Sequence, residues 1–289
     1  GYLLWKHLIF PYVYDLQTKP ALIPQPKDLK WHEGLFALPH ARSILINQDS
    51  IFPLAHQLQN KLKDWGYPLP IVKTTLPGAN NISLQLINTG NKNDESYHVK
   101  ISAENILISA SSAHGIFNGL QTLYQLLRDK TMAAACEIND TAAFAWRGYM
   151  VDAGRNYQSI KQLKAQMDVM ASYKLNIFHF HLTEDIAWRL QSKMYPMLTQ
   201  AGYMQRNPGE YYSLDEMKDL IQYCKERYIT LIPEIDMPGH SAAFERAMGV
   251  SMQSAKGLEI CKNIITELCT ELEVPYIHIG GDEVKITNK

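Results

Sequence analysis

The sequence predicts an α/β protein of the (β/α)8 TIM-barrel type, preceded by a smaller α+β domain. In its second half, near-continuously apolar segments alternate with amphipathic ones, which indicates a parallel sheet covered by helices on both faces. Each apolar segment is followed by a cluster of polar residues. A complete barrel needs about 250 residues, and only about half of that number follows Ala145. We therefore expect a barrel that is truncated after its fourth strand.

The alternation of apolar and amphipathic segments predicts where the strands and helices of this second half lie. Strands are predicted over 146–155, 175–185, 229–240 and 275–284, with helices over 159–174, 213–228 and 254–272. The second of these helices begins with a capping-box pattern, Ser213 and Glu216. The predicted boundaries are an N-terminal segment 1–20, an α+β domain 21–140 and the first half of the barrel 141–289.

The first domain combines strands with two helices. Strands are predicted over 43–47, 81–87, 96–102 and 105–112, and helices over 50–66 and 113–130. Residues 21–34, which are punctuated by prolines, are expected to form an extended lead into this domain. Strands that pair on one side of two helices form an α+β layer.

Composition excludes some classes of partner. The formal net charge is −1, and Lys and Arg do not cluster in the way that tracks phosphates, so nucleic-acid binding is not expected. No run approaches the ~18 apolar residues that span a bilayer. The apolar opening, residues 1–17, is interrupted by Lys6, His7, Pro11 and Asp15 and lacks the features of a signal peptide.

Polar residues gather where each predicted strand of the second half ends. In α/β enzymes this edge of a parallel sheet holds the chemistry, so these residues are the candidate site. They are Asp152 and Arg155, then His181, Glu184 and Asp185, then Asp236 and His240, and finally Asp282 and Glu283.

The last cluster follows two glycines, Gly280 and Gly281. Adjacent side chains of a flat strand point to opposite faces, so Asp282 and Glu283 can serve one site only where the strand has ended. The glycines permit such a bend and a close approach of a ligand to the backbone. A solvated acidic loop is the alternative.

Neighbouring carboxylates are poorly placed to straddle a sugar, since a retaining glycosidase with its own nucleophile needs two carboxyls roughly 5–5.5 Å apart. Separate roles suit these two carboxylates better, with Glu283 as proton donor and Asp282 as partner of a group on the substrate. A substrate-assisted route, in which a 2-acetamido group attacks the anomeric carbon, is compatible with these roles.

Histidines suggest a second interpretation. His179 and His181 share one face of their strand, and such a pair can hold zinc in a metal-dependent hydrolase, together with His240, His278 or Asp282. The spacing lacks the H-E-x-x-H pattern that makes zinc specific, and histidines hydrogen-bonded inside a polar site are the alternative. Trp188 and Arg189 could form a stacking platform or pack on a surface helix.

Four segments carry a resemblance to a known family. They are "RGYMVDAGRNY", "LNIFHFHLTEDIAWRLQSKMYPMLT", "IPEIDMPGHSAA" and "YIHIGGDEV", in this order and at barrel-like spacing. Together they resemble the family-20 glycoside hydrolases, the β-N-acetylhexosaminidases, whose His-x-Gly-Gly-Asp-Glu signature the last segment matches. The resemblance covers about 145–286 closely, and 21–140 more loosely resembles the domain that precedes the barrel in this family.

The resemblance implies roles for individual residues. Glu283 would be the general acid/base, and Asp282 would hold the acetamido group as it closes to an oxazolinium intermediate. Arg155 would bind hydroxyls of the terminal sugar. His240 and Glu184 would sit near Glu283 and tune its proton affinity.

Other implications concern the rest of the site. Asp185 and His179 are further substrate-site candidates, and neither a metal nor another cofactor is implied. Glu184 stands where many members have Asp, and Asn156 where many have His. In the family, later strands of the barrel supply tryptophans and a tyrosine around the sugar. Residues 1–289 do not include those strands.

The predicted function is that of a retaining exo-β-N-acetylhexosaminidase, which releases terminal N-acetylglucosamine or N-acetylgalactosamine from a carbohydrate partner. Two alternatives stay open: an inactive, glycan-binding fragment, and a metal-dependent hydrolase built on His179 and His181. An extracytoplasmic location is expected from a polymeric substrate, and the sequence leaves the oligomeric state unspecified.

Overall fold

The computed structural model describes residues 19–76, 78–87, 94–127 and 129–286. Its contacts divide the chain into two compact units, residues 1–145 with 172–174 and residues 146–171 with 175–289. Residues 1–18 of the predicted N-terminal segment lie outside the described residues. Within the described residues, no helix is both long and apolar enough to cross a membrane.

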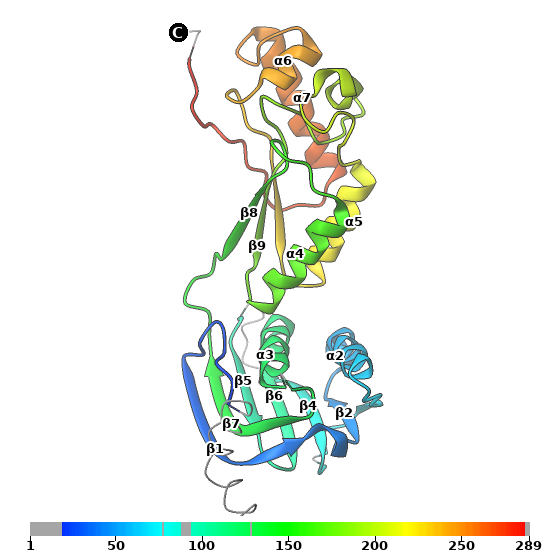
Figure 1. Cartoon of the computed structure of the whole chain (residues 1–289), viewed down its shortest axis with the longest axis vertical. Coiled ribbons are helices and arrows are strands. Elements are labelled where there is room, and N and C mark those ends of the chain that lie inside the picture. The colour runs from blue at the N-terminus through cyan, green and yellow to red at the C-terminus, as the bar shows by residue number, and fades with distance from the viewer. Residues whose placement is uncertain (1–18, 77, 88–93, 128, 287–289) are drawn as a thin grey trace, which may run out of the picture. The chain divides into compact units, whose positions relative to one another are not determined.

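Among its described residues, the first unit contains a seven-stranded mixed sheet with two helices against one face (Figure 1). The strand order is β1-β7-β5-β6-β4-β2-β3. Its strands are β1 (Asp28–Ala37), β2 (Ser43–Ile46), β3 (Ile71–Lys73), β4 (Asn81–Leu86), β5 (Tyr97–Ile101), β6 (Asn105–Ala110) and β7 (Met132–Asp140). Its helices are α2 (Phe52–Asp64) and α3 (Ala113–Leu126), with 3₁₀ turns at Leu38–His40 and Asp49–Ile51. The smaller α+β domain that the sequence predicts is confirmed.

Three strands of this sheet differ from the prediction, and one of them, the short β3 that pairs parallel with β2, was not predicted. β1 covers part of the stretch expected to be an extended lead, and β7, which was not predicted, pairs antiparallel with both β1 and β5. Neither has a clear strand pattern, because β1 is rich in polar residues and β7 in alanine, both weak strand formers. Pairing within the sheet stabilises them where local propensity does not.

The second unit contains a parallel sheet in the order β10-β9-β8. Its strands are β8 (Gly148–Asp152), β9 (Ile177–His181) and β10 (Thr230–Glu234). Its helices are α4 (Ile160–Ser172), α5 (Leu214–Lys225), α6 (Ala242–Met248) and α7 (Ala255–Glu271), with 3₁₀ turns at Pro196–Thr199 and Ala201–Tyr203. This β-α-β alternation is that of the first part of a (β/α)8 barrel, as predicted; α6 was not predicted.

Local signals explain where these elements begin. The side chain of Ser213 accepts a hydrogen bond from the backbone N–H of Glu216, whose carboxylate accepts in return, so the predicted capping box at the start of α5 is confirmed. The buried face of α4 carries Leu163, Met167 and Met170 at helical spacing. The middle strand, β9, buries Phe178 and Phe180 completely.

The prediction of a fourth strand over 275–284 is wrong. Residues 276–279 run beside β10, where His278 donates its N–H to the carbonyl of Pro233 at 3.0 Å and accepts from Ile235 at 3.1 Å. Only an isolated bridge between Glu234 and His278 results. The extended path ends at Gly280 and Gly281, whose φ angles of 65° and 113° lie in the region that favours glycine.

Candidate active site

The carboxyl ends of the parallel strands bring ionisable side chains into one row. In the register of the sheet, Asp152 pairs with His181, and His181 pairs with Glu234. The isolated bridge adds His278 beside Glu234. Residues at one level of a parallel sheet project to the same face, so these four side chains share one side of the sheet.

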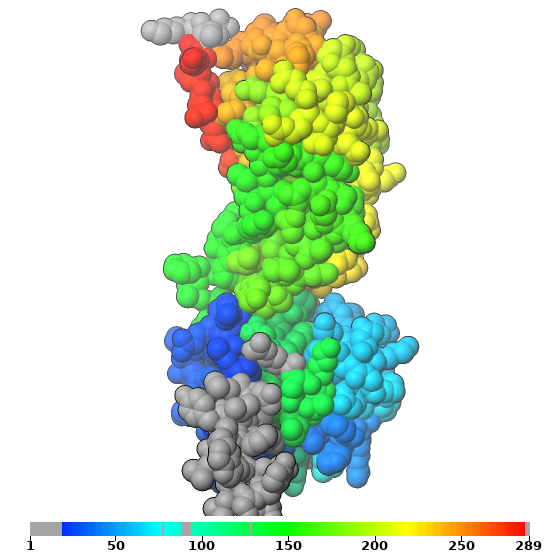
Figure 2. Space-filling view, viewed as in Figure 1, coloured from blue at the N-terminus to red at the C-terminus, as the bar shows by residue number. Residues whose placement is uncertain are grey.

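The predicted acid, Glu283, lies beside His240. Its carboxylate is 3.4 Å from Nε2 of His240, while Nδ1 of the same ring is 3.2 Å from the carboxylate of Glu184. The Glu283 side chain is 84% exposed and that of Glu184 is 2% exposed. In Figure 2 the red segment near the C-terminus lies at the surface. One imidazole thus connects a solvent-facing carboxylate to a buried one.

Backbone conformation supports this arrangement. His240 and Glu283 both have positive φ angles, 45° and 50°, which residues other than glycine adopt uncommonly. Such conformations persist only where the surrounding structure enforces them, and they concentrate at functional sites.

The buried carboxylate of Glu184 is also paired with Arg155. The guanidinium lies 2.6 Å from Glu184 and 2.5 Å from Asp152, and these two carboxylates raise the pKa of Arg155 above its usual value. Its side chain is nevertheless 48% exposed, so part of the fork faces solvent. A side chain at Gly154 would come within 2.9 Å of Glu184, so glycine is needed there for this close approach.

Asp185 contacts the segment that leads into α6. Its carboxylate accepts a hydrogen bond from the N–H of Ala242 at 3.0 Å, at the start of α6, and lies 3.9 Å from Nδ1 of His240. Asp185 thus helps to hold the segment that carries His240.

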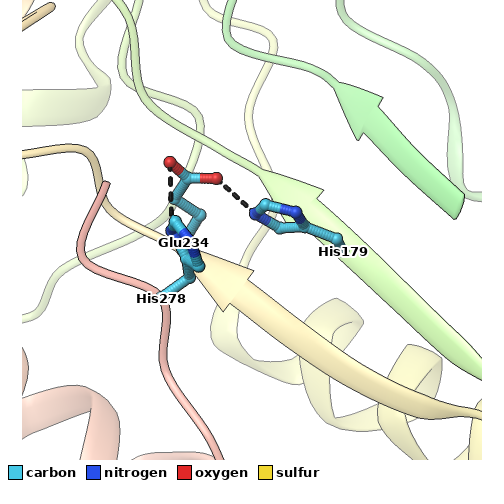
Figure 3. A group of neighbouring side chains, drawn as sticks. All are labelled: His179, Glu234 and His278. Carbon is cyan, nitrogen blue, oxygen red and sulfur yellow. Dashed lines mark hydrogen bonds and ion pairs between the residues drawn. The ribbon is translucent and has the colours of Figure 1, made fainter. Parts of the chain in front are cut away.

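Glu234 is the centre of a second cluster (Figure 3). It is 2% exposed, and its carboxylate contacts Nε2 of His179, Nδ1 of His181 at 3.1 Å and Nδ1 of His278 at 3.3 Å. Burial acts to raise the pKa of Glu234, but the hydrogen bonds and charges of His179 and His181 prevail and hold it well below its usual value. The cluster therefore keeps a buried carboxylate ionised.

Asp282 faces this second cluster, whereas its neighbour Glu283 faces His240. A carboxylate oxygen of Asp282 lies within 4.8 Å of one from Glu234 and one from Asp236. Asp236 is fully buried, and its Oδ1 accepts a 2.8 Å hydrogen bond from the N–H of Gly281, while its Oδ2 has no hydrogen-bond partner among the described residues. The turn at 280–281 thus sends two adjacent carboxylates to two different surroundings.

Comparison with known proteins identifies this arrangement. The model of the glycosyl hydrolase family 20 catalytic domain matches residues 144–257, and the model of domain 2 of the same family matches residues 19–141. The chain belongs to glycosyl hydrolase family 20.

Relatives in family 20 share most of this chain. A Beta-hexosaminidase of Porphyromonas gingivalis is 32% identical over 91% of this chain and 38% of its own length. A Beta-N-acetylhexosaminidase of Cellulomonas fimi is 30% identical over 91% of this chain and 60% of its own. The chain thus spans about two fifths of the first relative's length and three fifths of the second's.

Solved family-20 structures have the same fold. The exo-β-N-acetylglucosaminidase of Vibrio harveyi in complex with N-acetylglucosamine superposes with a TM-score of 0.82 at 27% identity, over 91% of this chain and 47% of that one. The β-N-acetylhexosaminidase of Bacteroides fragilis gives 0.81 at 29% identity, over 92% and 58%.

The alternative of a metal-dependent hydrolase is not supported by where its residues lie. Among the described residues, His179 shares a potential three-ligand group with Glu234 and His278, not with His181 and Asp282. Both histidines of that group contact the Glu234 carboxylate (Figure 3), and Nδ1 of His278 also accepts the N–H of Gly280 at 3.0 Å. His181 belongs to a different potential three-ligand group, with Asp152 and Glu184.

Glu234 is an addition to the predicted site, whereas His181 and Asp236 already belong to the polar clusters that the sequence indicated. Glu234 lies within the apolar run of β10. Because burying an ionisable side chain without partners is unfavourable, its position in such a run indicates from the sequence that it has polar partners in the fold. The interpretations of Trp188 and Arg189 were wrong. Trp188 is 2% exposed and donates to the carbonyl of Leu190, while Arg189 is fully buried.

Proposed function

We propose that the protein carrying this chain is a retaining exo-β-N-acetylhexosaminidase that uses substrate assistance. The observation that carries the proposal is the opposite orientation of Glu283 and Asp282, one toward His240 and the other toward Asp236 and Glu234. The related enzymes of Vibrio harveyi and Streptomyces plicatus form complexes with N-acetylglucosamine, which supports a terminal N-acetylglucosamine as substrate.

In the first step Glu283 transfers its proton to the glycosidic oxygen. The bond from that oxygen to the anomeric carbon breaks, and its electron pair stays with the leaving group. The carbonyl oxygen of the 2-acetamido group forms the new bond to the anomeric carbon and closes an oxazolinium ring. Asp282 orients the acetamido N–H and stabilises the positive charge that develops on it.

In the second step the Glu283 carboxylate removes a proton from water. The water oxygen attacks the anomeric carbon, and the bond to the acetamido oxygen breaks. Two successive displacements give net retention, and Glu283 returns to its protonated state. Arg155, half exposed beside Asp152 and Glu184, would donate to hydroxyls of the terminal sugar. Asp185 and His179 would support the walls of the same site.

The test is hydrolysis of β-N-acetylglucosaminides by the whole gene product and its Glu283→Gln variant. The variant should lose about 10²–10⁴-fold in kcat for a sugar leaving group. The loss should be smaller for an aryl leaving group of low pKa, which needs less protonation. Glu273→Gln is the matched control, because the Glu273 side chain is 90% exposed and pairs only with Lys225 among the described contacts.

Substrate assistance has its own signature. An aryl β-glucoside, which lacks the acetamido group, should not be hydrolysed, and Asp282→Asn should lower kcat more than it raises KM. Binding of N-acetylglucosamine without turnover, unchanged by Glu283→Gln, would support a glycan-binding protein instead.

A further inference from the structure

His181 occupies a position between the two clusters of the site. It ends β9, between β8 and β10, and is 4% exposed. Its Nδ1 lies 3.1 Å from the carboxylate of Glu234, and its Nε2 lies 3.3 Å from the carboxylate of Glu184. Among the described residues, His181 is the one side chain that contacts both of these buried carboxylates.

The protonation of His181 follows from its partners. A neutral imidazole has one donor and one acceptor nitrogen, whereas an ionised carboxylate only accepts. Two carboxylates at hydrogen-bond distance therefore require both ring nitrogens to donate, and a ring that donates twice is a cation.

The charges around the ring agree with this state. Asp152 faces it from β8, Glu234 from β10 and Glu184 from the loop after β9, while Arg155 lies beyond Glu184. Burial acts to lower the pKa of His181, but these carboxylates prevail and raise it to about 9.

We propose that His181 is a positioning residue, a buried imidazolium that joins the acid side of the site, Glu184–His240–Glu283, to the Glu234 cluster beside Asp282. This inference rests on the proposed function. With both carboxylates held by one rigid ring on the central strand, the proton donor and the partner of the acetamido group are set at a constant separation. A change at either cluster is transmitted to the other through His181.

Loss of the cation has a defined consequence for the acid. Without it, the negative charge on Glu184 and Glu234 is less compensated, and each carboxylate loses a ring nitrogen that holds it in place. The basic limb of the kcat profile should then move to higher pH, because a positive charge joined to the acid through Glu184 and His240 has been removed.

The first test requires no hydrolysis. Imidazole ¹⁵N spectra of the ¹⁵N-histidine-labelled whole protein should show protons on both ring nitrogens of His181 at pH 7.5. The His181 signals are assigned by their loss in His181→Asn, with His40→Asn, at an exposed histidine, as the control. One bare ring nitrogen on His181 at this pH would overturn the proposal.

The second test separates positioning from folding. In His181→Asn the amide can replace the donor toward Glu234, and in His181→Gln the donor toward Glu184. Each variant should lose at least about tenfold in kcat, with KM changed less, and the basic limb of the kcat profile should move up by about one pH unit.

The outcomes are distinguishable. A folded variant, checked by circular dichroism, whose basic limb stays in place would contradict positioning by His181. If Glu283→Gln retains full activity, the proposed function fails, whereas the ¹⁵N result still decides the charge of His181.

Discussion

Asp236 occupies the space that a side chain at residue 280 would need. A Cβ atom built on Gly280 would lie 1.9 Å from Oδ1 of Asp236. The same oxygen accepts the N–H of Gly281 at 2.8 Å. The turn that separates Asp282 from Glu283 therefore packs directly on a buried carboxylate.

Gly280→Ala should accordingly disrupt both the turn and the site. Alanine at a φ of 65° is strained, and its methyl group would displace Asp236. We expect a loss of about 2 kcal/mol or more in unfolding free energy and a fall in kcat. Urea denaturation and hydrolysis assays measure the two effects.

Two glycine variants serve as controls for this prediction. Gly281→Ala has the strain of a positive φ but no atom within 4 Å of the new methyl group, so it isolates the backbone effect. Gly202→Ala has open space and should be nearly neutral. A Gly280→Ala protein as stable and active as Gly202→Ala would contradict the close-packing argument.

The strand-end clusters could be predicted because two simple patterns coincide. Apolar runs such as that of β9 mark buried parallel strands, and polar residues directly after them must lie at one edge of the sheet. The glycines before Asp282 correctly indicated a bend. At Gly280 the group in close approach to the backbone is Asp236.

Other features depend on contacts that no local pattern encodes. β7 is rich in alanine and becomes a strand only through pairing with β1 and β5. Likewise, His181 was found within a polar cluster, but its bridging position depends on the register between β9 and β10. Register is set by tertiary pairing, and here it determines which carboxylates lie beside the His181 ring.

His240→Asn should weaken the acid without disturbing the backbone. Asparagine tolerates the φ of 45° at this position, but its amide cannot contact both Glu184 and Glu283 as the ring does. We expect kcat to fall by about 10–100-fold. In a double-mutant cycle with Glu184→Gln the losses should be less than additive, since the two residues act in one chain of contacts. Additive losses would show that they act independently.

Arg189→Lys should destabilise the loop between β9 and α5. The buried guanidinium donates to the carbonyls of Ala153, Asn207, Glu210 and Arg206, at 2.6–3.1 Å. Lysine cannot reproduce this planar fork, so we expect a loss of about 3 kcal/mol in unfolding free energy. Arg227→Lys, at a surface ion pair with Asp168, should lose less than about 1 kcal/mol. Equal losses in the two variants would refute a special role for the buried arginine.

The charge of His181 should make stability fall as pH rises. Its pKa is raised from 6.5 to about 9 in the fold, so its contribution is complete below pH 6.5 and is lost as pH rises through 9. The contribution is on the order of 3 kcal/mol. Between pH 6 and pH 9, the unfolding free energy measured by urea denaturation should therefore fall less for His181→Gln than for the wild type. This comparison does not depend on the absolute stability of the variant. His40→Gln should retain the wild-type drop, because His40 is exposed and far from these carboxylates in sequence. An undiminished drop in His181→Gln would mean that the folded protein does not hold this ring as a cation.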